Sequence, residues 1–228
     1  MLVGSGPSLK HVSQEMLDRH SCITMAINQQ PWMAGLWTDH VVFIDGVRML
    51  NGHPQKQHLY DGMVEVLQNE GITKWTRRVF NNRGEPAINA GRNMRYFVPY
   101  YNLPPEEYFR YKDVYCGDLQ REEKHEGYDF ENTFFTSGLF HLYHVSSILP
   151  AFRIMYEMGC RRIYLLGTDF RPLQDRFIFI NDRLTGLQPV FLAHGLEVLN
   201  CTRDSGLTAF PFEEFPAATE PEPCLMSV

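Results

Sequence analysis

Leu2-Val3-Gly4-Ser5-Gly6-Pro7-Ser8-Leu9 is the stretch of sequence that decides the fold. Its apolar start predicts a short buried strand, and a helical pattern follows from Leu9 to Arg19. The G-x-G-P-S turn between them would place backbone N–H groups and a helix N-terminus beside the end of the strand, where a phosphate or diphosphate can bind. The turn is neither the G-x-G-x-x-G fingerprint of dinucleotide sites nor a Walker A loop. A tight strand-to-helix connection without a ligand is the alternative.

Each residue of this turn has an expected role. Gly4 and Gly6 would let the backbone approach an anion closely. Pro7 suits the first turn of a helix, where no N–H is needed. Ser5 or Ser8 would cap the helix or contact the anion.

Four further segments have the composition of buried strands and end in polar residues. They predict a mostly parallel, twisted α/β sheet with helices on both faces, whose ligands bind just past the strand ends. The segments are Cys22–Ile27, His40–Asp45, Arg161–Phe170 and Leu196–Cys201. We expect one domain over residues 1–215, with an irregular insertion or lid at 46–132, and a disordered Pro/Glu-rich tail at 216–228.

The composition limits the class of protein. The chain has 228 residues, 44% of them hydrophobic, which is enough for one domain with a substantial core. A formal net charge of −6 disfavours a surface that coats duplex DNA. No apolar run approaches the ~20 residues of a membrane span, and we expect no signal peptide, because the first predicted strand already carries the glycine-rich motif. We expect a cytoplasmic protein, and the composition leaves its oligomeric state open.

No metal site is predicted. The five cysteines include no C-x-x-C pair, so reduced thiols are expected rather than a zinc site or disulfides; they are Cys22, Cys116, Cys160, Cys201 and Cys224. His141 and His144 lie three residues apart on a predicted helix and could share a metal. They have no obvious third ligand, and core or solvent-exposed histidines are the favoured interpretation.

Three blocks of sequence carry a family resemblance. They are V-G-S-G-P-S-L-K at 3–10 with A-I-N-Q at 26–29, F-T-S-G-L at 135–139 with M-G-C-R-R-I-Y-L-L-G-T-D-F at 158–170, and V-L-N-C-T-R-D-S-G-L-T-A-F at 198–210. Together they cover about half of the chain. Their order resembles that in the bacterial lipooligosaccharide sialyltransferases. It is equally similar to a set of proteins, many of them phage-encoded, that are allied to the archaeal hydroxymethylpterin diphosphokinases. The resemblance implies a Rossmann-like sheet with a nucleotide or nucleotide-sugar site.

The resemblance also implies which residues form that site. Gly4, Ser5, Gly6, Pro7 and Ser8 would form the phosphate-side turn, and Asn28 would face the nucleotide. The remaining matches are Thr136, Ser137 and Gly138 beside the donor, Gly167 and Asp169 at a strand end, and Ser205 and Gly206 in a late turn.

One departure from the sialyltransferase pattern matters. Those enzymes have a catalytic histidine and two tyrosines between the G-x-D-F strand and the last strand. Here the interval 171–196 contains one histidine, His194, and no tyrosine. CMP-sialic acid is therefore not supported as the donor. Asp169 and His194 are the candidate bases for the acceptor hydroxyl, and the alternative role for Asp169 is to cap a helix.

Two weaker candidates complete the list. Asp45 ends a strand as Asp169 does, and both acids could hold Mg²⁺ in a diphosphokinase. A basic–aromatic cluster could grip a sugar, a base or a single strand by stacking, although an ordinary half-buried patch is favoured. Its members are Arg92, Arg95, Tyr96, Tyr100 and Tyr101.

The leading hypothesis is an enzyme, a transferase that uses a nucleotide-activated donor, most simply a glycosyltransferase. For a phage protein, a surface glycan and a modified DNA base are both open as acceptors. One alternative is a diphosphokinase-like enzyme that uses ATP and Mg²⁺. The other is a nucleotide-binding module without catalysis.

Overall fold

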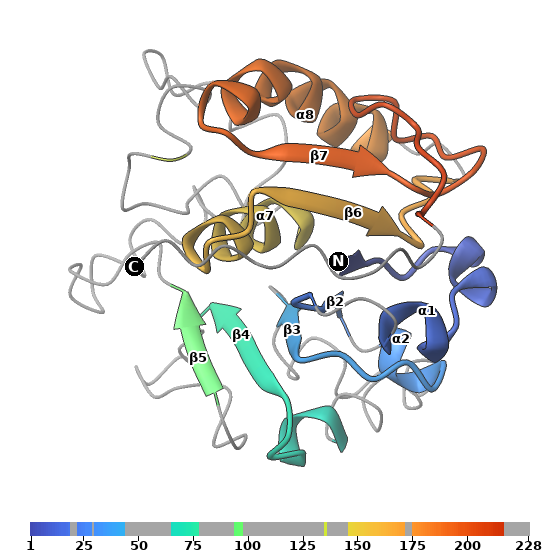
Figure 1. Ribbon diagram of the computed structural model, residues 1–228, viewed down its shortest axis with the longest axis vertical. Helices are drawn as coiled ribbons and strands as arrows, with labels where there is room; N and C mark the ends of the chain where they lie inside the picture. Colours follow the sequence, from blue (N-terminus) through green and yellow to red (C-terminus); the bar gives the residue numbers. More distant parts are fainter. Residues whose placement is uncertain are drawn as a thin grey trace.

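Seven strands form one sheet in which every neighbouring pair is parallel (Figure 1). This computed structural model describes residues 1–18, 22–28, 30–43, 65–77, 94–97, 135, 146–171 and 175–216. The strands are β1 (Leu2–Val3), β2 (Met25–Ile27), β3 (His40–Phe43), β4 (Thr73–Arg77), β5 (Met94–Phe97), β6 (Arg162–Leu166) and β7 (Glu197–Asn200). The predicted fold class, a parallel α/β sheet, is confirmed.

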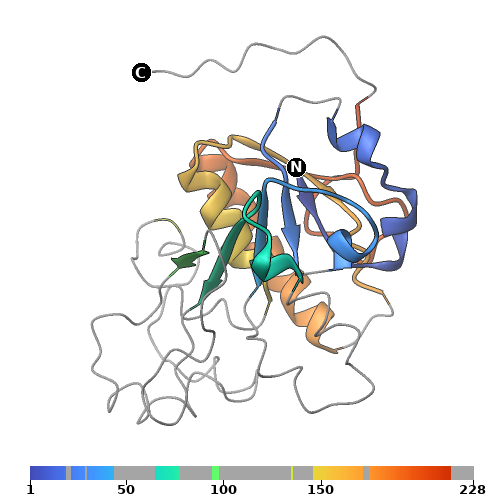
Figure 2. The same ribbon diagram turned by 90° about the horizontal axis from the view of Figure 1, so that it is seen from below.

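Helices cover both faces of the sheet, as Figure 2 shows edge-on. They are η1 (Pro7–His11), α1 (Gln14–Asp18), α2 (Gln30–Met33), α7 (Ile148–Glu157) and α8 (Asp175–Ala193), with a helical turn at 65–68. Neighbouring strand residues point to opposite faces. Leu2 packs in the core under α7 and α8, whereas Val3 packs with residues of η1 and α1. Both side chains are fully buried.

The strand order places a topological switch beside β1. The order across the sheet is β5-β4-β3-β2-β1-β6-β7. The chain therefore moves outward in one direction from β1 to β5, and then returns to the other side of β1 to form β6 and β7. The carboxyl ends of β1 and β6 therefore flank this topological switch, the point at which sheets of this kind have a crevice. In open α/β sheets such a crevice is the usual ligand site.

The prediction for residues 46–132 is partly wrong. Residues 73–77 and 94–97 within this interval form β4 and β5, so this part continues the sheet rather than covering it. The sequence of residues 75–80 indicates a strand, which overlaps β4, whereas the mixture of aromatic residues and arginine at 92–101 did not predict β5. The rest of the expected insertion lies outside the described residues, as does the tail from 217 on.

The sequence predicts a long helical pattern over 140–158, interrupted by Pro150, and a further helix that includes residues 191–194. In α7, which starts at Ile148, Pro150 falls in the first turn, where a missing N–H costs no hydrogen bond. Pro150 therefore does not interrupt a longer helix, as the sequence suggested. The further helix is α8, which starts at Asp175 and ends at Ala193, so His194 directly follows it. Among the helices that the structure describes, none is both long and apolar enough to cross a membrane.

His40 opens β3 and is held in the neutral form by its surroundings. The Trp75 indole Nε1–H donates to His40 Nδ1 at 3.3 Å, so this ring nitrogen acts as an acceptor. Partial burial lowers the pKa of His40, and the nearby Asp39 carboxylate opposes this effect. Protonation would put an N–H on Nδ1, facing the Trp75 N–H.

Acidification should therefore destabilise the fold through His40. Between its lowered native pKa and the ordinary value of about 6.5, the unfolded chain binds more protons than the native one. Stability rises with pH through that window, and the penalty is fully present below the native pKa. We expect a lower Tm at about pH 5 than at about pH 7.5, and a smaller difference for His40→Gln. An equal pH dependence in both proteins would contradict the assignment.

Candidate active site

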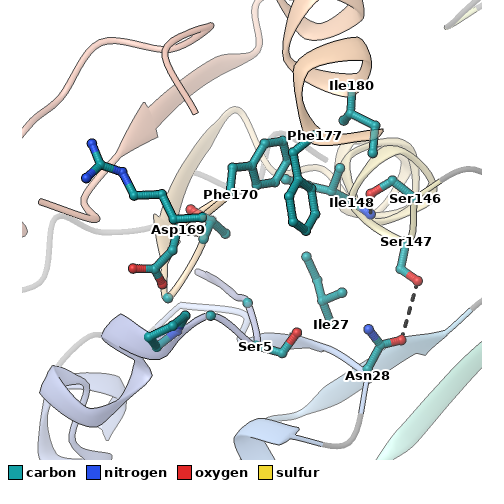
Figure 3. A pocket seen from close by; sticks show the side chains of 16 residues that line it. Ser5, Ile27, Asn28, Ser146, Ser147, Ile148, Asp169, Phe170, Phe177 and Ile180 are labelled. Atoms are coloured by element: carbon teal, nitrogen blue, oxygen red, sulfur yellow. Dashed lines mark hydrogen bonds between the residues drawn. The ribbon is translucent and has the colours of Figure 1, made fainter. Parts of the chain in front are cut away.

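A cavity of about 280 Å³ opens at the switch between β1 and β6 (Figure 3). Its lining comes from the ends of β1, β2 and β6, from the start of α7 and from the first turns of α8. The lining residues are Gly4, Ser5, Gly6, Pro7, Ile27, Asn28, Ser146, Ser147, Ile148, Gly167, Thr168, Asp169, Phe170, Arg171, Phe177 and Ile180. The volume lies at the lower limit of ordinary small-molecule pockets, roughly 300 Å³.

The glycine-rich turn at 4–8 forms one wall, but most of its N–H groups are already used. Gly4 N–H donates to the Leu166 carbonyl at 2.7 Å, and Gly6 N–H donates to the Gly167 carbonyl at 2.8 Å. Pro7 has no N–H. The turn therefore joins the end of β1 to the end of β6, as a structural connection would. Ser5 keeps its hydroxyl pointed into the cavity (Figure 3).

Glycine is needed at two positions of this turn because residues that follow β6 pack directly against its backbone. A Cβ added at Gly4 would overlap the backbone carbonyl of Gly167, and a Cβ at Gly6 would overlap the side chain of Asp169. The φ of Gly6 is −78°, which every residue adopts readily. The space beside Gly6 is thus occupied by the Asp169 side chain of the protein, so glycine is required there without any bound anion.

Asp169 sits just past β6, as predicted, and is tied to the turn. Its Oδ2 accepts hydrogen bonds from Ser8 N–H at 3.0 Å and from Ser8 Oγ at 2.6 Å. The carboxylate thereby caps η1, which is the structural role weighed for it above. Among the described lining residues it is the only acid, and Arg171, which is exposed, is the only cation. Asp169 Oδ1 has no hydrogen bond within the described part of the chain.

Asn28 lies where the sequence placed it, at the end of β2 on the cavity wall. Its φ of 62° is in the left-handed region, which asparagine tolerates better than most residues. Its N–H donates to the Val42 carbonyl at 2.9 Å. Across the cavity mouth, Ser147 Oγ donates weakly to Asn28 Oδ1 at 3.4 Å (Figure 3).

The start of α7 supplies polar groups that the sequence reading missed. Ser147 is the N-cap residue, and its side chain makes no capping bond to the helix. Ser146 and Ser147 both line the cavity, so hydroxyl groups and the positive end of the helix dipole face it. Two serines directly before an apolar helical pattern are a readable start signal. Only the tertiary structure brings them opposite Asn28.

Ser205 and Gly206 support the site without lining it. Ser205 Oγ donates to the Thr168 carbonyl at 2.6 Å, and Gly206 N–H donates to the Asp169 carbonyl at 2.7 Å. These bonds hold the backbone that follows β6. Gly167, with φ of 66°, starts the bend there and does line the cavity.

His194, the other predicted candidate base, does not line this cavity. It follows α8, which runs back along the sheet to the amino end of β7, whereas the cavity lies at the carboxyl ends of β1 and β6. The His194 ring packs on Phe135, with centroids 4.5 Å apart, and near Tyr156 at 6.4 Å. Position along the chain could not reveal which end of the sheet the helix reaches.

Several predicted residues fall outside the described part of the chain. They are Thr136, Ser137, Gly138, Asp45, His141, His144, Arg92, Tyr100 and Tyr101. Arg95 and Tyr96 lie on β5. Within the described residues, no group of three or more acidic, histidine or cysteine side chains is placed to hold a metal ion.

Comparisons of this chain with protein-family models, with curated proteins and with solved structures find no match. The sialyltransferase-like resemblance thus stays a prediction, and the geometry of the cavity carries the functional argument.

Proposed function

We propose that this chain is a transferase that binds a nucleotide-activated donor, most simply a sugar nucleotide, in the cavity between β1 and β6. One observation carries the proposal. The polar ends of β1 and β2 and the start of α7 converge on one cavity at the topological switch of a parallel sheet, the position at which such sheets hold nucleotides.

Residues around the cavity suit different parts of such a donor. Asn28 and Ser147 offer amide and hydroxyl groups to a sugar or a base. The first turn of α7 and Arg171 favour negative charge and would bind phosphate oxygens. The glycine turn then contributes Ser5 and a rigid wall, because its other N–H groups are already bonded.

Asp169 is the candidate base for the acceptor hydroxyl. Ser8 fixes one carboxylate oxygen, which orients the other. A positioned carboxylate that accepts a proton as the acceptor oxygen attacks is a common way to accelerate group transfer. The acceptor oxygen would form its new bond to the anomeric carbon of the sugar, while the bond between that carbon and the donor phosphate breaks and the nucleotide leaves with the electron pair.

Ligand binding can be tested first by thermal shift with nucleotides and sugar nucleotides. Binding at ~100-fold excess over Kd stabilises the fold by about 2.7 kcal/mol. Turnover is then measured with a glycan or DNA acceptor as release of nucleoside mono- or diphosphate. If no nucleotide or sugar nucleotide shifts the Tm, the proposal fails. Release of AMP from ATP with Mg²⁺ and an acceptor would instead identify a diphosphokinase.

Asn28→Gly should weaken binding without disturbing the fold. Glycine keeps the left-handed backbone and removes only the amide side chain. We expect affinity to fall about 3- to 10-fold, as for the loss of one hydrogen bond of ~0.5–1.5 kcal/mol. The matched control is Asp204→Gly, because Asp204 also has a positive φ, of 57°, and does not line the cavity. Equal affinities of both variants would remove Asn28 from the site.

A nucleotide-binding module without catalysis is the second candidate. The observation that favours it is the pair of hydrogen bonds from Ser8 to Asp169, which is what a purely structural acid would make. Such a module would show the thermal shift without product release from any acceptor. Asp169→Asn would then leave the ligand-binding behaviour of the folded protein unchanged.

A further inference from the structure

Phe170 and Phe177 form an aromatic wall on the cavity, and we propose that this wall stacks against the planar base of the ligand. The inference rests on the proposed function and deepens it, because it names the part of the protein that recognises the nucleoside. The wall was not among the predicted site residues.

The two rings are stacked on one another. Their centroids lie 5.1 Å apart, with an angle of 27° between the ring planes. Both side chains are half-buried and both line the cavity. In Figure 3 the rings lie together above Ile27. A flat apolar face opposite an aliphatic side chain can hold a flat ring between them. Any of the common bases can stack on an aromatic side chain, because every base has a π-face.

The backbone at Phe170 is the second observation. Its φ is 50°, in the left-handed region, where a bulky residue is a real outlier. Such a conformation costs energy and persists only when the surroundings enforce it, most often at functional sites. Here Ser205 and Gly206 enforce it through their bonds to the carbonyls of Thr168 and Asp169.

The left-handed backbone at Phe170 directs the side chains of residues 169 and 170 to different parts of the structure. Asp169 turns to Ser8 on the glycine turn, and Phe170 turns into the cavity. The left-handed backbone thus places the Phe170 ring on the cavity wall, where it also packs against the hydrophobic core.

The polar residues fit the same arrangement. Asn28 and Ser147 lie at one side of the cavity and Arg171 follows Phe170 directly. A base stacked on the wall would direct its ribose and phosphate to these groups. A phosphate without a base would contact the polar groups alone and leave the wall uncovered.

The test compares ligands with and without a base. The probes are the four common nucleoside 5′-monophosphates and ribose 5-phosphate, titrated into the full-length protein by calorimetry. For the wild type, we expect at least one nucleotide to bind more tightly than ribose 5-phosphate. Phe170→Leu keeps an apolar side chain and removes the ring, so nucleotide affinity should fall about 10- to 100-fold. Its affinity for ribose 5-phosphate should stay that of the wild type.

Controls separate stacking from folding. Phe212→Leu makes the same change at an exposed phenylalanine away from the cavity and should not alter affinity. Phe170→Tyr keeps the ring and should recover most of the affinity lost in Phe170→Leu. If Phe170→Leu does not fold, Phe177→Leu takes its place and should weaken nucleotide binding in the same selective way.

The outcomes distinguish this inference from the proposed function. If the wild type binds nucleotides and Phe170→Leu binds them equally well, the aromatic wall is wrong and the nucleotide site stands. Wild-type binding of ribose 5-phosphate as tight as that of every nucleotide overturns the inference too. If no nucleoside monophosphate binds to the wild type, the aromatic wall is overturned, and the proposed function fails as well only if sugar nucleotides do not shift the Tm.

Discussion

Gly4→Ala is expected to destabilise the protein at the upper end of the ~1–3 kcal/mol typical of overpacking. The added Cβ would overlap the backbone carbonyl of Gly167, which has no flexible side chain that can move aside. Gly4 N–H also donates a hydrogen bond to the Leu166 carbonyl at this point of close contact. Relief of the overlap would therefore push the ends of β1 and β6 apart and weaken this bond. Urea denaturation of wild type and variant measures the loss, and an unchanged midpoint would contradict this close approach.

Gly6→Ala provides an internal comparison, because its clash is with a side chain. The three nearest atoms to the added Cβ all belong to the side chain of Asp169. Asp169→Ala should therefore relieve much of the cost of Gly6→Ala, giving a double variant more stable than the sum of the single effects predicts. Asp169→Ala should not reduce the loss of stability caused by Gly4→Ala. Additive effects in both pairs would show that Gly6 does not depend on Asp169.

These two glycines also show which features of the turn could be predicted from the sequence. The strand–turn–helix order at residues 2–11 was readable from the apolar start, the two glycines and Pro7. It was equally consistent with an anion site and with a structural turn. The choice depends on hydrogen bonds from Gly6 and Ser8 to the end of β6, some 160 residues away. No local pattern carries that information.

The site residues divide in the same way. Asn28 and Asp169 were predictable because polar residues after buried strands gather at one edge of a parallel sheet. Ser147 and Phe170 were missed, since the first depends on where α7 begins and the second on a left-handed backbone. His194 was misplaced because its helix carries it to the opposite edge. β5 was not predicted as a strand, because its short M-R-Y-F sequence shows no clear apolar alternation.

Phe152→Ala should be the most damaging single change, costing about 3–5 kcal/mol of stability. Phe152 lies in the middle of α7 and is fully buried. Its ring makes edge-to-face contacts with Phe191 on α8, at 5.5 Å between centroids, and with Phe210, at 5.7 Å. Alanine would leave a cavity where two helices and the chain after β7 meet.

Phe212→Ala is the matched control, because that ring is 50% exposed and should cost less than about 1 kcal/mol. Urea midpoints of the two variants should therefore differ widely, and similar midpoints would contradict the packing around Phe152. Phe152 does not line the cavity. Below its melting temperature, folded Phe152→Ala should bind nucleotide with wild-type affinity, whereas Asn28→Gly should lose affinity at unchanged stability. That reciprocal pattern separates residues that build the cavity from residues that contact the ligand.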